Sequence, residues 1–325
     1  MQVVRNVTVV IVNWNSWDIL SRCLEKLQAQ TFRDFKVLVV DNASDRPAPA
    51  DLFSRHPGIS LIQNQANLGF AAANNQAIRS PDAAEWLALL NPDAFPEPDW
   101  LERLVDAARE NPDCAMFASR QLMDGDLALL DGDGDVYNIS GLVWRAGHGR
   151  RADAAGQPRE VFSPCAAAAL YRRDALVAAG GFDEDFFCYV EDVDLGFRLR
   201  LLGHRCLLVP AAVVHHIGSA TTGGQRSDFS VYHGHRNLVW AYVKNMPGWL
   251  FWACLPLHVA MNLAIVCMFM LRGQGRVIFR AKRDALAGLP KMWRKRRQIQ
   301  ESRIAPVHEI LRVLDKRLFP GRKGR

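Results

Sequence analysis

Three carboxylates and one histidine stand where their types and spacing could do chemistry. Asp93 follows a buried strand-like run, and His216 follows a later one. Glu191 and Asp192 open a helix-like run between them. A carboxylate just past a strand can hold Mg²⁺ or Mn²⁺, imidazole can share the ion, and a carboxylate at a helix start can act as a general base. Together these residue types suit metal-assisted transfer of a group from a diphosphate.

Each of the four residues also has a purely structural interpretation. Asp93 could belong to a turn before the helix expected from Pro98. Acids at a helix start, such as Glu191 and Asp192, gain from the helix dipole whether or not they react. A lone histidine is more often structural, and only the acidic residues upstream favour a ligand role for His216. The combination, rather than any single residue, supports the chemical interpretation.

Short apolar runs and helix-like runs alternate through the first third of the chain. The expected strands cover residues 7–12, 36–40, 59–62 and 86–90, and the expected helices cover 17–30, 69–79 and 98–110. Continuous apolar strands that alternate with helices predict an α/β fold with a mostly parallel sheet covered on both faces. In such a sheet, ligands bind beyond the carboxyl ends of the strands.

Amide and carboxylate residues follow these strand ends. They are Asn13, Asn15, Asp41, Asn67, Asn91 and Asp93. A carboxylate such as Asp41 can accept hydrogen bonds from a base or a ribose hydroxyl, although an Asx-turn would also explain it. Gly69 opens a helix of small residues whose N-terminus favours phosphate, although close helix–sheet packing is the alternative. The strand ends therefore predict a binding site at this edge of the sheet.

The middle of the chain gives weaker patterns. Residues 124–157 are rich in glycine and aspartate, and we expect them to form a loop and a short hairpin. Within them, 131–135 resembles the start of a calcium loop, but Val136 and Leu142 occupy the positions that need glycine and glutamate, which excludes such a loop. The further expected strands cover 162–172 and 205–209, and the further expected helices cover 174–179 and 192–202.

The C-terminal part differs in composition from the rest. The net charge of +6 is uneven, because basic residues crowd from Arg272 to Arg325. Before them, 245–271 contains no Asp, Glu, Lys or Arg and is longer than the roughly 20 apolar residues that span a bilayer. Pro256 and the basic flank favour a re-entrant or in-plane helix pair over a single crossing, and a buried core helix is the alternative. We therefore expect association with a membrane surface.

Length, cysteines and missing motifs narrow the class of protein. The 325 residues suffice for one large α/β domain with an appendage. The seven cysteines form no CxxC pair, which argues against a zinc ribbon or a disulfide framework and predicts a reducing compartment. The chain passes from Met1 almost directly into a strand-like run, so we expect no cleaved signal peptide. Glycine-rich dinucleotide and P-loop motifs are lacking, which weakens dehydrogenase and P-loop interpretations.

Seven motifs follow one another in the order of a known family. They are VVIVNWN (9–15), VVDNASD (39–45), NLGFAAANNQAI (67–78), LLNPDA (89–94), GGFDEDFFCYVEDVDLGFRLR (180–200), HHIGSAT (215–221) and HRNLVWAYVKNMP (235–247). Together they resemble the family 2 glycosyltransferases with the GT-A fold, and within them the rhamnosyltransferase-like branch. The resemblance covers residues 7–247, and seven motifs in order are far more specific than one.

The resemblance implies a donor site for a nucleotide-sugar. Asp41 would contact the base, and Asn91-Pro92-Asp93 occupies the place of the family's DxD motif, with asparagine at its first acidic position. Asp93 would then bind Mg²⁺ or Mn²⁺ and the diphosphate, and His216 falls on the later metal or diphosphate ligand. The other donor-binding residues would be Asn13, Asn15, Asn67, Gly69 and Asn91.

The resemblance also implies the reaction, an inverting single displacement in which Asp192 deprotonates an acceptor hydroxyl. On the acceptor side, Glu191 would act together with a shelf of aromatic side chains that contacts the acceptor sugar. Core packing is the alternative role for these aromatic residues. The shelf residues would be Phe182, Phe186 and Tyr189. The QxxRW motif of processive members is absent, which favours addition of a single sugar.

The same resemblance indicates the substrates. The donor would be TDP-rhamnose, with a UDP-sugar as the alternative. The acceptor would be a saccharide or a polyprenyl-diphosphate-linked saccharide at the cytoplasmic face of the plasma membrane, in cell-surface polysaccharide biosynthesis.

We therefore expect a GT-A catalytic domain over 1–245 and a membrane-associated apolar helical segment with a basic tail over 246–325. A nucleotidyltransferase is a rival, but the loop after the first strand lacks the glycines and basic residues that hold a triphosphate. A catalytically inactive, membrane-docked nucleotide-sugar-binding protein is the non-enzymatic alternative. Trp293 among basic residues makes nucleic-acid binding conceivable, but the apolar segment favours lipid, so we expect no nucleic-acid partner.

Overall fold

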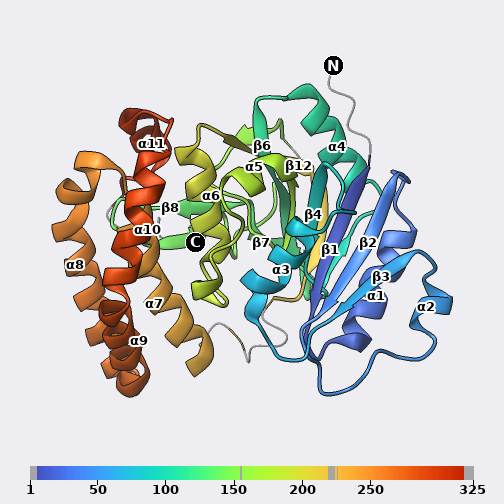
Figure 1. Cartoon of the computed structure of the whole chain (residues 1–325), viewed down its shortest axis with the longest axis horizontal. Coiled ribbons are helices and arrows are strands. Elements are labelled where there is room, and N and C mark those ends of the chain that lie inside the picture. The colour runs from blue at the N-terminus through green and yellow to red at the C-terminus, as the bar shows by residue number, and fades with distance from the viewer. Residues whose placement is uncertain (1–5, 154–155, 219–223, 225, 318–325) are drawn as a thin grey trace.

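A mixed sheet with helices on both faces forms the larger part of the protein, and a group of C-terminal helices packs against one end of it (Figure 1). The computed structural model describes residues 6–153, 156–218, 224 and 226–317. The ends of the chain and part of the HHIGSAT motif therefore lie outside the described residues.

The sheet has ten strands, and its main path runs β10-β12-β6-β11-β4-β1-β2-β3. The strands are β1 (Val7–Asn13), β2 (Phe35–Asp41), β3 (Ile59–Gln63), β4 (Trp86–Leu90), β5 (Ala94–Pro96), β6 (Cys114–Met123), β7 (Asp126–Gly132), β10 (Arg159–Glu160), β11 (Ala168–Arg172) and β12 (Arg205–His216). Strands β1 to β4 run parallel to their neighbours among themselves, whereas β11 is antiparallel to both β4 and β6. A separate hairpin pairs β8 (Asp135–Tyr137) with β9 (Val143–Arg145).

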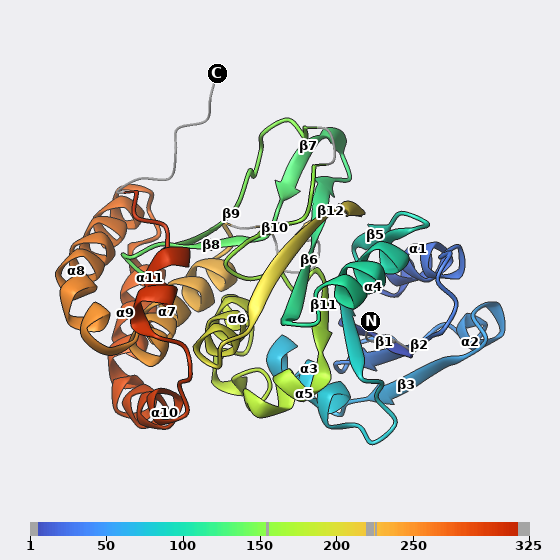
Figure 2. The ribbon, with the colours of Figure 1, turned by 90° about the horizontal axis from the view of Figure 1, so that it is seen from above.

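The helices are α1 (Trp17–Gln28), α2 (Leu52–Arg55), α3 (Gly69–Arg79), α4 (Trp100–Glu110), α5 (Arg173–Ala178), the 3₁₀ turn η1 (Glu184–Phe186), α6 (Glu191–Leu201), α7 (Asp228–Asn245), α8 (Gly248–Leu271), α9 (Gly275–Ala287), α10 (Leu289–Glu301) and α11 (Val307–Val313). Seen from above, α1 and α4 cover one face of the sheet and α3, α5 and α6 cover the other (Figure 2). Each face has its own apolar core, because the continuous apolar strands present side chains to both sides.

For two strands, the bounds expected from the sequence were wrong. The strand expected over 162–172 begins only at Ala168, because Pro164 has no N–H to donate to a ladder. The strand expected over 205–209 continues to His216, because the register shifts between Val209 and Val213 and absorbs Pro210 as a bulge. His216 is therefore the last residue of a strand rather than a residue in the following turn.

The C-terminal helices share an apolar cluster with residues that precede them in the chain. Phe186 and Phe197 pack there with Trp240 and Met292. The buried ammonium of Lys244 on α7 also pairs with Asp183 and Asp194. The domain boundary proposed after residue 245 falls between α7 and α8.

The apolar segment is one continuous helix, α8, and not a helix pair. Among the described residues, α8 is the one helix long and apolar enough to cross a membrane. Only five of its residues are buried against the protein, namely Leu250, Phe251, Cys254, His258 and Phe269.

Candidate active site

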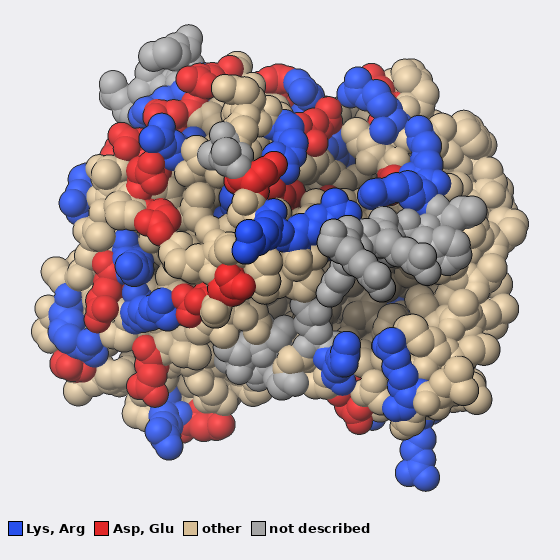
Figure 3. All heavy atoms as spheres, turned by 180° about the vertical axis from the view of Figure 1, so that it is seen from behind, with Lys and Arg blue, Asp and Glu red and all other residues tan. Residues whose placement is uncertain are grey.

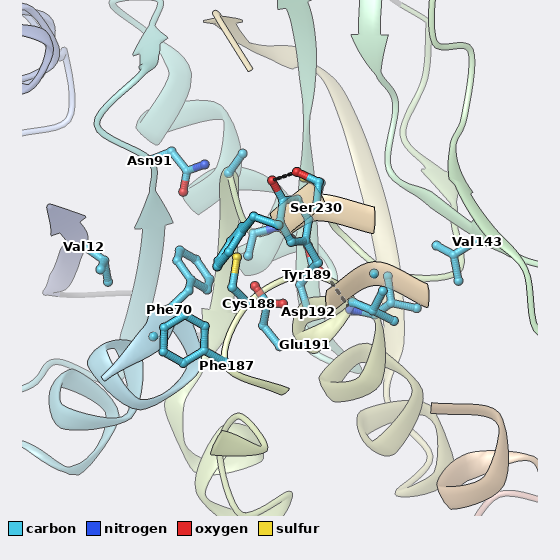
Figure 4. A pocket seen from close by; sticks show the side chains of 18 of the residues that line it. Val12, Phe70, Asn91, Val143, Phe187, Cys188, Tyr189, Glu191, Asp192 and Ser230 are labelled. Atoms are coloured by element: carbon cyan, nitrogen blue, oxygen red, sulfur yellow. Dashed lines mark hydrogen bonds between the residues drawn. The ribbon is translucent and has the colours of Figure 1, made fainter. Parts of the chain in front are cut away.

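A cavity of about 830 Å³ opens beyond the carboxyl ends of β1 and β4. Its wall draws on several parts of the chain, among them the start of α3, the loop after β4, the segment that leads into α6, and α7 (Figure 4). Asn67 and Gly69 line it from the first part, and Asn91 and Asp93 from the second. The strand-end edge predicted from the sequence is thus one wall of this cavity.

Asn13 and Asp41 lie beside this wall, and neither is among the described residues that line the cavity. They face each other across β1 and β2, and Asn13 Nδ2 donates to Asp41 Oδ1 at 3.0 Å. Ser44 donates to the same carboxylate oxygen at 2.5 Å, so Asp41 has the local turn contacts of the structural alternative. Asn15 is exposed and pairs with Asp45. Base contact by these residues remains a proposal.

Asn42 joins the end of β2 to the segment between β3 and α3, and it was not among the predicted site residues. Its Nδ2 donates to Asn67 Oδ1 at 2.8 Å, and its Oδ1 accepts from the Leu68 N–H at 3.1 Å. It also lines the cavity. Its position directly after Asp41, at a strand end, was a signal that could have identified it.

His216 is held between two carboxylates, Asp93 and Asp131. Its Nδ1 lies 2.7 Å from Asp131 Oδ2, and its Nε2 lies 3.3 Å from Asp93 Oδ1. Arg145 of β9 also pairs with Asp131. Asp131 was missed because it lies in the run rejected as a calcium loop, and no local pattern links it to a histidine 85 residues away.

These residues fit a divalent metal ion. When Nδ1–H donates a hydrogen bond to Asp131, the lone pair of His216 lies on Nε2, the arrangement that metal-binding histidines use. Nε2 is buried and lies 3.3 Å from Asp93 Oδ1, but the two atoms are not aligned for a hydrogen bond. No group of three His, Cys, Asp or Glu among the described residues could hold an ion alone, so water and diphosphate oxygens would supply the other ligands.

Protons and a divalent metal ion would compete for the imidazole of His216. Burial lowers the pKa of His216, but the neighbouring carboxylates of Asp131 and Asp93 outweigh it and raise the pKa above its usual value. Burial raises the pKa of Asp131, but His216 and Arg145 outweigh it and lower the pKa. Because a ligating histidine must be neutral, metal binding here should weaken as the pH falls.

Glu191 and Asp192 start α6 with their carboxyl groups close together near the middle of the cavity (Figure 4). Asp192 accepts from the N–H groups of Ala166 at 3.1 Å and Val193 at 2.8 Å. Burial raises the pKa of Asp192, although these N–H groups oppose the rise. Burial, and then the charge of Asp192, raise the pKa of Glu191 well above its usual value. A cavity carboxylate with a raised pKa is a candidate general base.

Two of the three predicted shelf residues belong to the core. Phe182 and Phe186 are 2% and 0% exposed, and neither is among the residues that line the cavity within the described chain. Core packing, the alternative interpretation, therefore applies to both. Tyr189 does line the cavity, and its hydroxyl lies 2.8 Å from Ser230 Oγ on α7 (Figure 4). Phe187, which was not predicted, lines it as well.

Comparison with known proteins decides the family. The model of Glycosyl transferase family 2 matches residues 8–178, more than half of the chain. The chain belongs to this family. The family assignment inferred from the seven motifs is confirmed, and with it the activity class of a glycosyltransferase.

Two curated relatives of this family 2 glycosyltransferase come from Mycobacterium tuberculosis. One, an N-acetylglucosaminyl-diphospho-decaprenol L-rhamnosyltransferase, is 31% identical over 69% of this chain and 80% of its own length. The other, a pre-mycofactocin glycosyltransferase, is 32% identical over 65% of this chain and 43% of its own length.

Solved structures show the fold of this glycosyltransferase to be GT-A-like. GalNAc-T7, determined with UDP, GalNAc and Mn²⁺, matches with a TM-score of 0.60 and 16% identity, over 74% of this chain and 48% of that one. TarS of S. aureus matches with a TM-score of 0.51 and 15% identity, over 74% of this chain and 40% of that one. The chain thus spans less than half of either structure.

Proposed function

We propose that this protein transfers one sugar from a nucleotide-sugar to an acceptor hydroxyl, with inversion at the anomeric carbon and with the help of Mg²⁺ or Mn²⁺. The observation that carries the proposal is that Asp192 and the Asp93–His216 pair line the same cavity. A general base and a place for diphosphate and its counterion are the two parts that a single displacement needs.

In this mechanism, Asp192 accepts the proton of the acceptor hydroxyl. The hydroxyl oxygen forms its bond to the anomeric carbon while the bond from that carbon to the diphosphate breaks. The N–H groups of Ala166 and Val193 hold the Asp192 carboxylate in place and leave it further lone pairs for the hydroxyl. A divalent ion held by Asp93 and His216 would neutralise the charge on the departing diphosphate.

The proposed donor is TDP-rhamnose, and a UDP-sugar is the alternative. Support for rhamnose comes from the relative that transfers L-rhamnose, at 31% identity. Support for a UDP-sugar is weaker, because GalNAc-T7, whose structure was determined with UDP, shares only its fold with this chain. Asn67, Gly69 and Asn91 would contact the donor from the cavity wall, with Asp41 and Asn13 fixing the strand ends behind them.

The proposed acceptor is a saccharide carried on a polyprenyl diphosphate at the cytoplasmic face of the plasma membrane. The outer face of α8 supports a membrane location, because Trp249, Trp252 and Leu263 are exposed along it. Tryptophan and aliphatic side chains on one face of a helix suit the boundary between headgroups and acyl chains, and nearby basic residues suit anionic headgroups. The function would then belong to cell-surface polysaccharide synthesis.

The test is nucleoside-diphosphate release by the purified protein from TDP-, UDP- and GDP-sugars. Each donor is assayed with Mn²⁺, with Mg²⁺ and with EDTA, and with a membrane lipid extract as acceptor. We expect metal-dependent and extract-dependent release from TDP-rhamnose. Release from a UDP-sugar alone would replace the donor, and release unaffected by EDTA would contradict the metal. If no donor reacts but TDP-rhamnose binds, the inactive nucleotide-sugar-binding protein becomes the better description.

A further inference from the structure

The turn that leads into α6 has an unusual backbone. Phe187, Tyr189 and Val190 have φ values of 63°, 67° and 70°. Residues other than glycine rarely adopt this left-handed conformation, and for a β-branched residue such as Val190 it is a true outlier. Such a backbone persists only where its surroundings enforce it, and it is typical of functional sites. Glu191 and Asp192 follow immediately.

Helix α7 supplies the contacts that enforce this turn. Asn237 is fully buried, and its Nδ2 lies 2.9 Å from the carbonyl oxygen of Phe186, 3.0 Å from that of Cys188 and 2.7 Å from that of Tyr189. One side-chain amide thus gathers three carbonyl groups of the turn.

Arg236, the residue before Asn237, supports the same contacts. Its Nη2 donates to the carbonyl oxygens of Asp185 at 3.1 Å and Phe186 at 3.0 Å. Its Nε donates to Asn237 Oδ1 at 2.9 Å, which fixes the amide so that the NH₂ group faces the turn. Both residues belong to the motif HRNLVWAYVKNMP, to which the proposed mechanism gives no role.

The rest of α6 is held by other contacts. Its first turn also carries Asp194, which pairs with Lys244, Arg198 and Asn245. Loss of Asn237 would therefore leave the helix anchored but release the turn before it. The other side of the turn contacts α3, the helix whose start would bind the sugar donor, because the Phe187 carbonyl accepts from the Ala71 N–H at 3.3 Å.

We propose that Asn237, oriented by Arg236, is a positioning residue that holds the turn 186–190 and thereby aims Asp192 into the cavity. This inference rests on the proposed function, because it takes Asp192 as the base. A misplacement of about 1 Å in such a group can cost about 10²-fold in rate.

The test uses the full chain with Asn237→Asp, which keeps the shape of the side chain but turns its donor into an acceptor. Asn138→Ala is the matched control, because Asn138 is also buried and also donates to a backbone carbonyl, that of Arg317, but does not line the cavity.

Turnover is measured as TDP release from TDP-rhamnose with membrane lipid extract, TDP affinity by calorimetry, and folding by thermal unfolding. We expect kcat of Asn237→Asp to fall about 10²-fold with TDP affinity unchanged, and Asn138→Ala to keep its kcat.

Three results would overturn the inference. Wild-type kcat in Asn237→Asp, with Asp192→Asn inactive, contradicts it while leaving the proposed function intact. Wild-type turnover in Asp192→Asn contradicts both. Where turnover is too slow to compare, a crystal structure of Asn237→Asp decides: we expect Tyr189 and Val190 to leave the left-handed region, and an unchanged turn would refute the positioning role. If that variant does not fold, Arg236→Ala takes its place in both measurements, because it removes a donor to the Phe186 carbonyl and the contact that orients Asn237.

Discussion

At the scale of residues, the site depends on partners that come from distant parts of the chain. Asp131 orients His216, the N–H of Ala166 holds Asp192, and Asn237 holds the turn before Asp192. None of these partners lies within the motif it serves. The proposed reactive groups could be selected from their local sequence, whereas the groups that orient them could not.

Replacing Asp131 tests the arrangement around His216. Asp131→Asn removes the carboxylate that fixes the imidazole, so the Mn²⁺ concentration needed for half-maximal activity should rise about 10–100-fold. Asp133→Asn is the control, because Asp133 is equally buried but pairs with Arg120 and Arg159 instead. Equal Mn²⁺ requirements in the two variants would contradict the role of Asp131.

The buried Glu191 should make stability depend on pH. Its pKa is raised by burial and by Asp192, so between the usual and the raised value the native protein binds more protons than the unfolded chain. The free energy of unfolding should then fall as the pH rises through this window, by about 1.4 kcal/mol for each unit of the shift.

Glu191→Gln cannot ionise and should escape this loss. Its Tm, measured by thermal unfolding, should change less than that of the wild type between about pH 5 and about pH 8. Glu110→Gln, at an exposed position, should behave as the wild type does. A parallel pH dependence of Glu191→Gln and wild type would refute an ionisation penalty at Glu191.

At the scale of elements, the start of α3 packs directly against the turn before α6. Gly69 has φ +83°, and a Cβ there would lie 2.6 Å from both the ring and the carbonyl oxygen of Phe187. The alternative given for this glycine, close packing, is therefore real, although the packing partner is a turn and not the sheet. The start of α3 and the turn before α6 thus hold each other in place.

Gly69→Ala should disrupt this contact. The left-handed backbone disfavours alanine by roughly 1–2 kcal/mol, and the clash with Phe187 should add about 1–3 kcal/mol. Gly58→Ala separates the two effects, because Gly58 has φ +92° and no atom within 4 Å of an added Cβ. Thermal unfolding should give a larger loss for Gly69→Ala, and equal losses would contradict the contact.

The elements of the N-terminal half could be predicted from the sequence because local patterns specify them. β4 and α3 have the predicted bounds, since a run of buried apolar residues defines one and a glycine start defines the other. β12 could not be predicted beyond Val209, because continuing through Pro210 needs a bulge against β6. α7 gives little periodic signal, since it is buried on several sides by α6, α9 and α10.

At the scale of the whole molecule, the outer face of α8 forms an edge with few charged side chains. In Figure 3 this edge, where α8 lies, is almost free of the colours that mark Lys, Arg, Asp and Glu. The exposed tryptophan and leucine side chains run along the outer face of one helix. A helix packed lengthwise on the protein with its other face apolar fits the proposed in-plane contact with a membrane better than a crossing.

Leu263→Glu tests the membrane face. Leu263 is 62% exposed, so the change should not disturb the fold, but it should weaken pelleting with vesicles of anionic phospholipid about tenfold or more. Leu127→Glu on β7, 50% exposed, is the control and should pellet as the wild type does. Added salt should weaken binding of all three proteins. Equal pelleting of the two variants would argue against α8 as the membrane face.

We propose above that Asp192 is the base of a sugar transfer whose donor binds in the same cavity. The most direct measurement compares Asp192→Asn with wild type in acceptor-dependent nucleoside-diphosphate release and in affinity for the same nucleoside diphosphate. We expect kcat to fall about 10²–10⁴-fold while the affinity is unchanged, because the amide cannot take the proton but leaves the residues that would contact the donor in place. Turnover at the wild-type rate would contradict this role of Asp192.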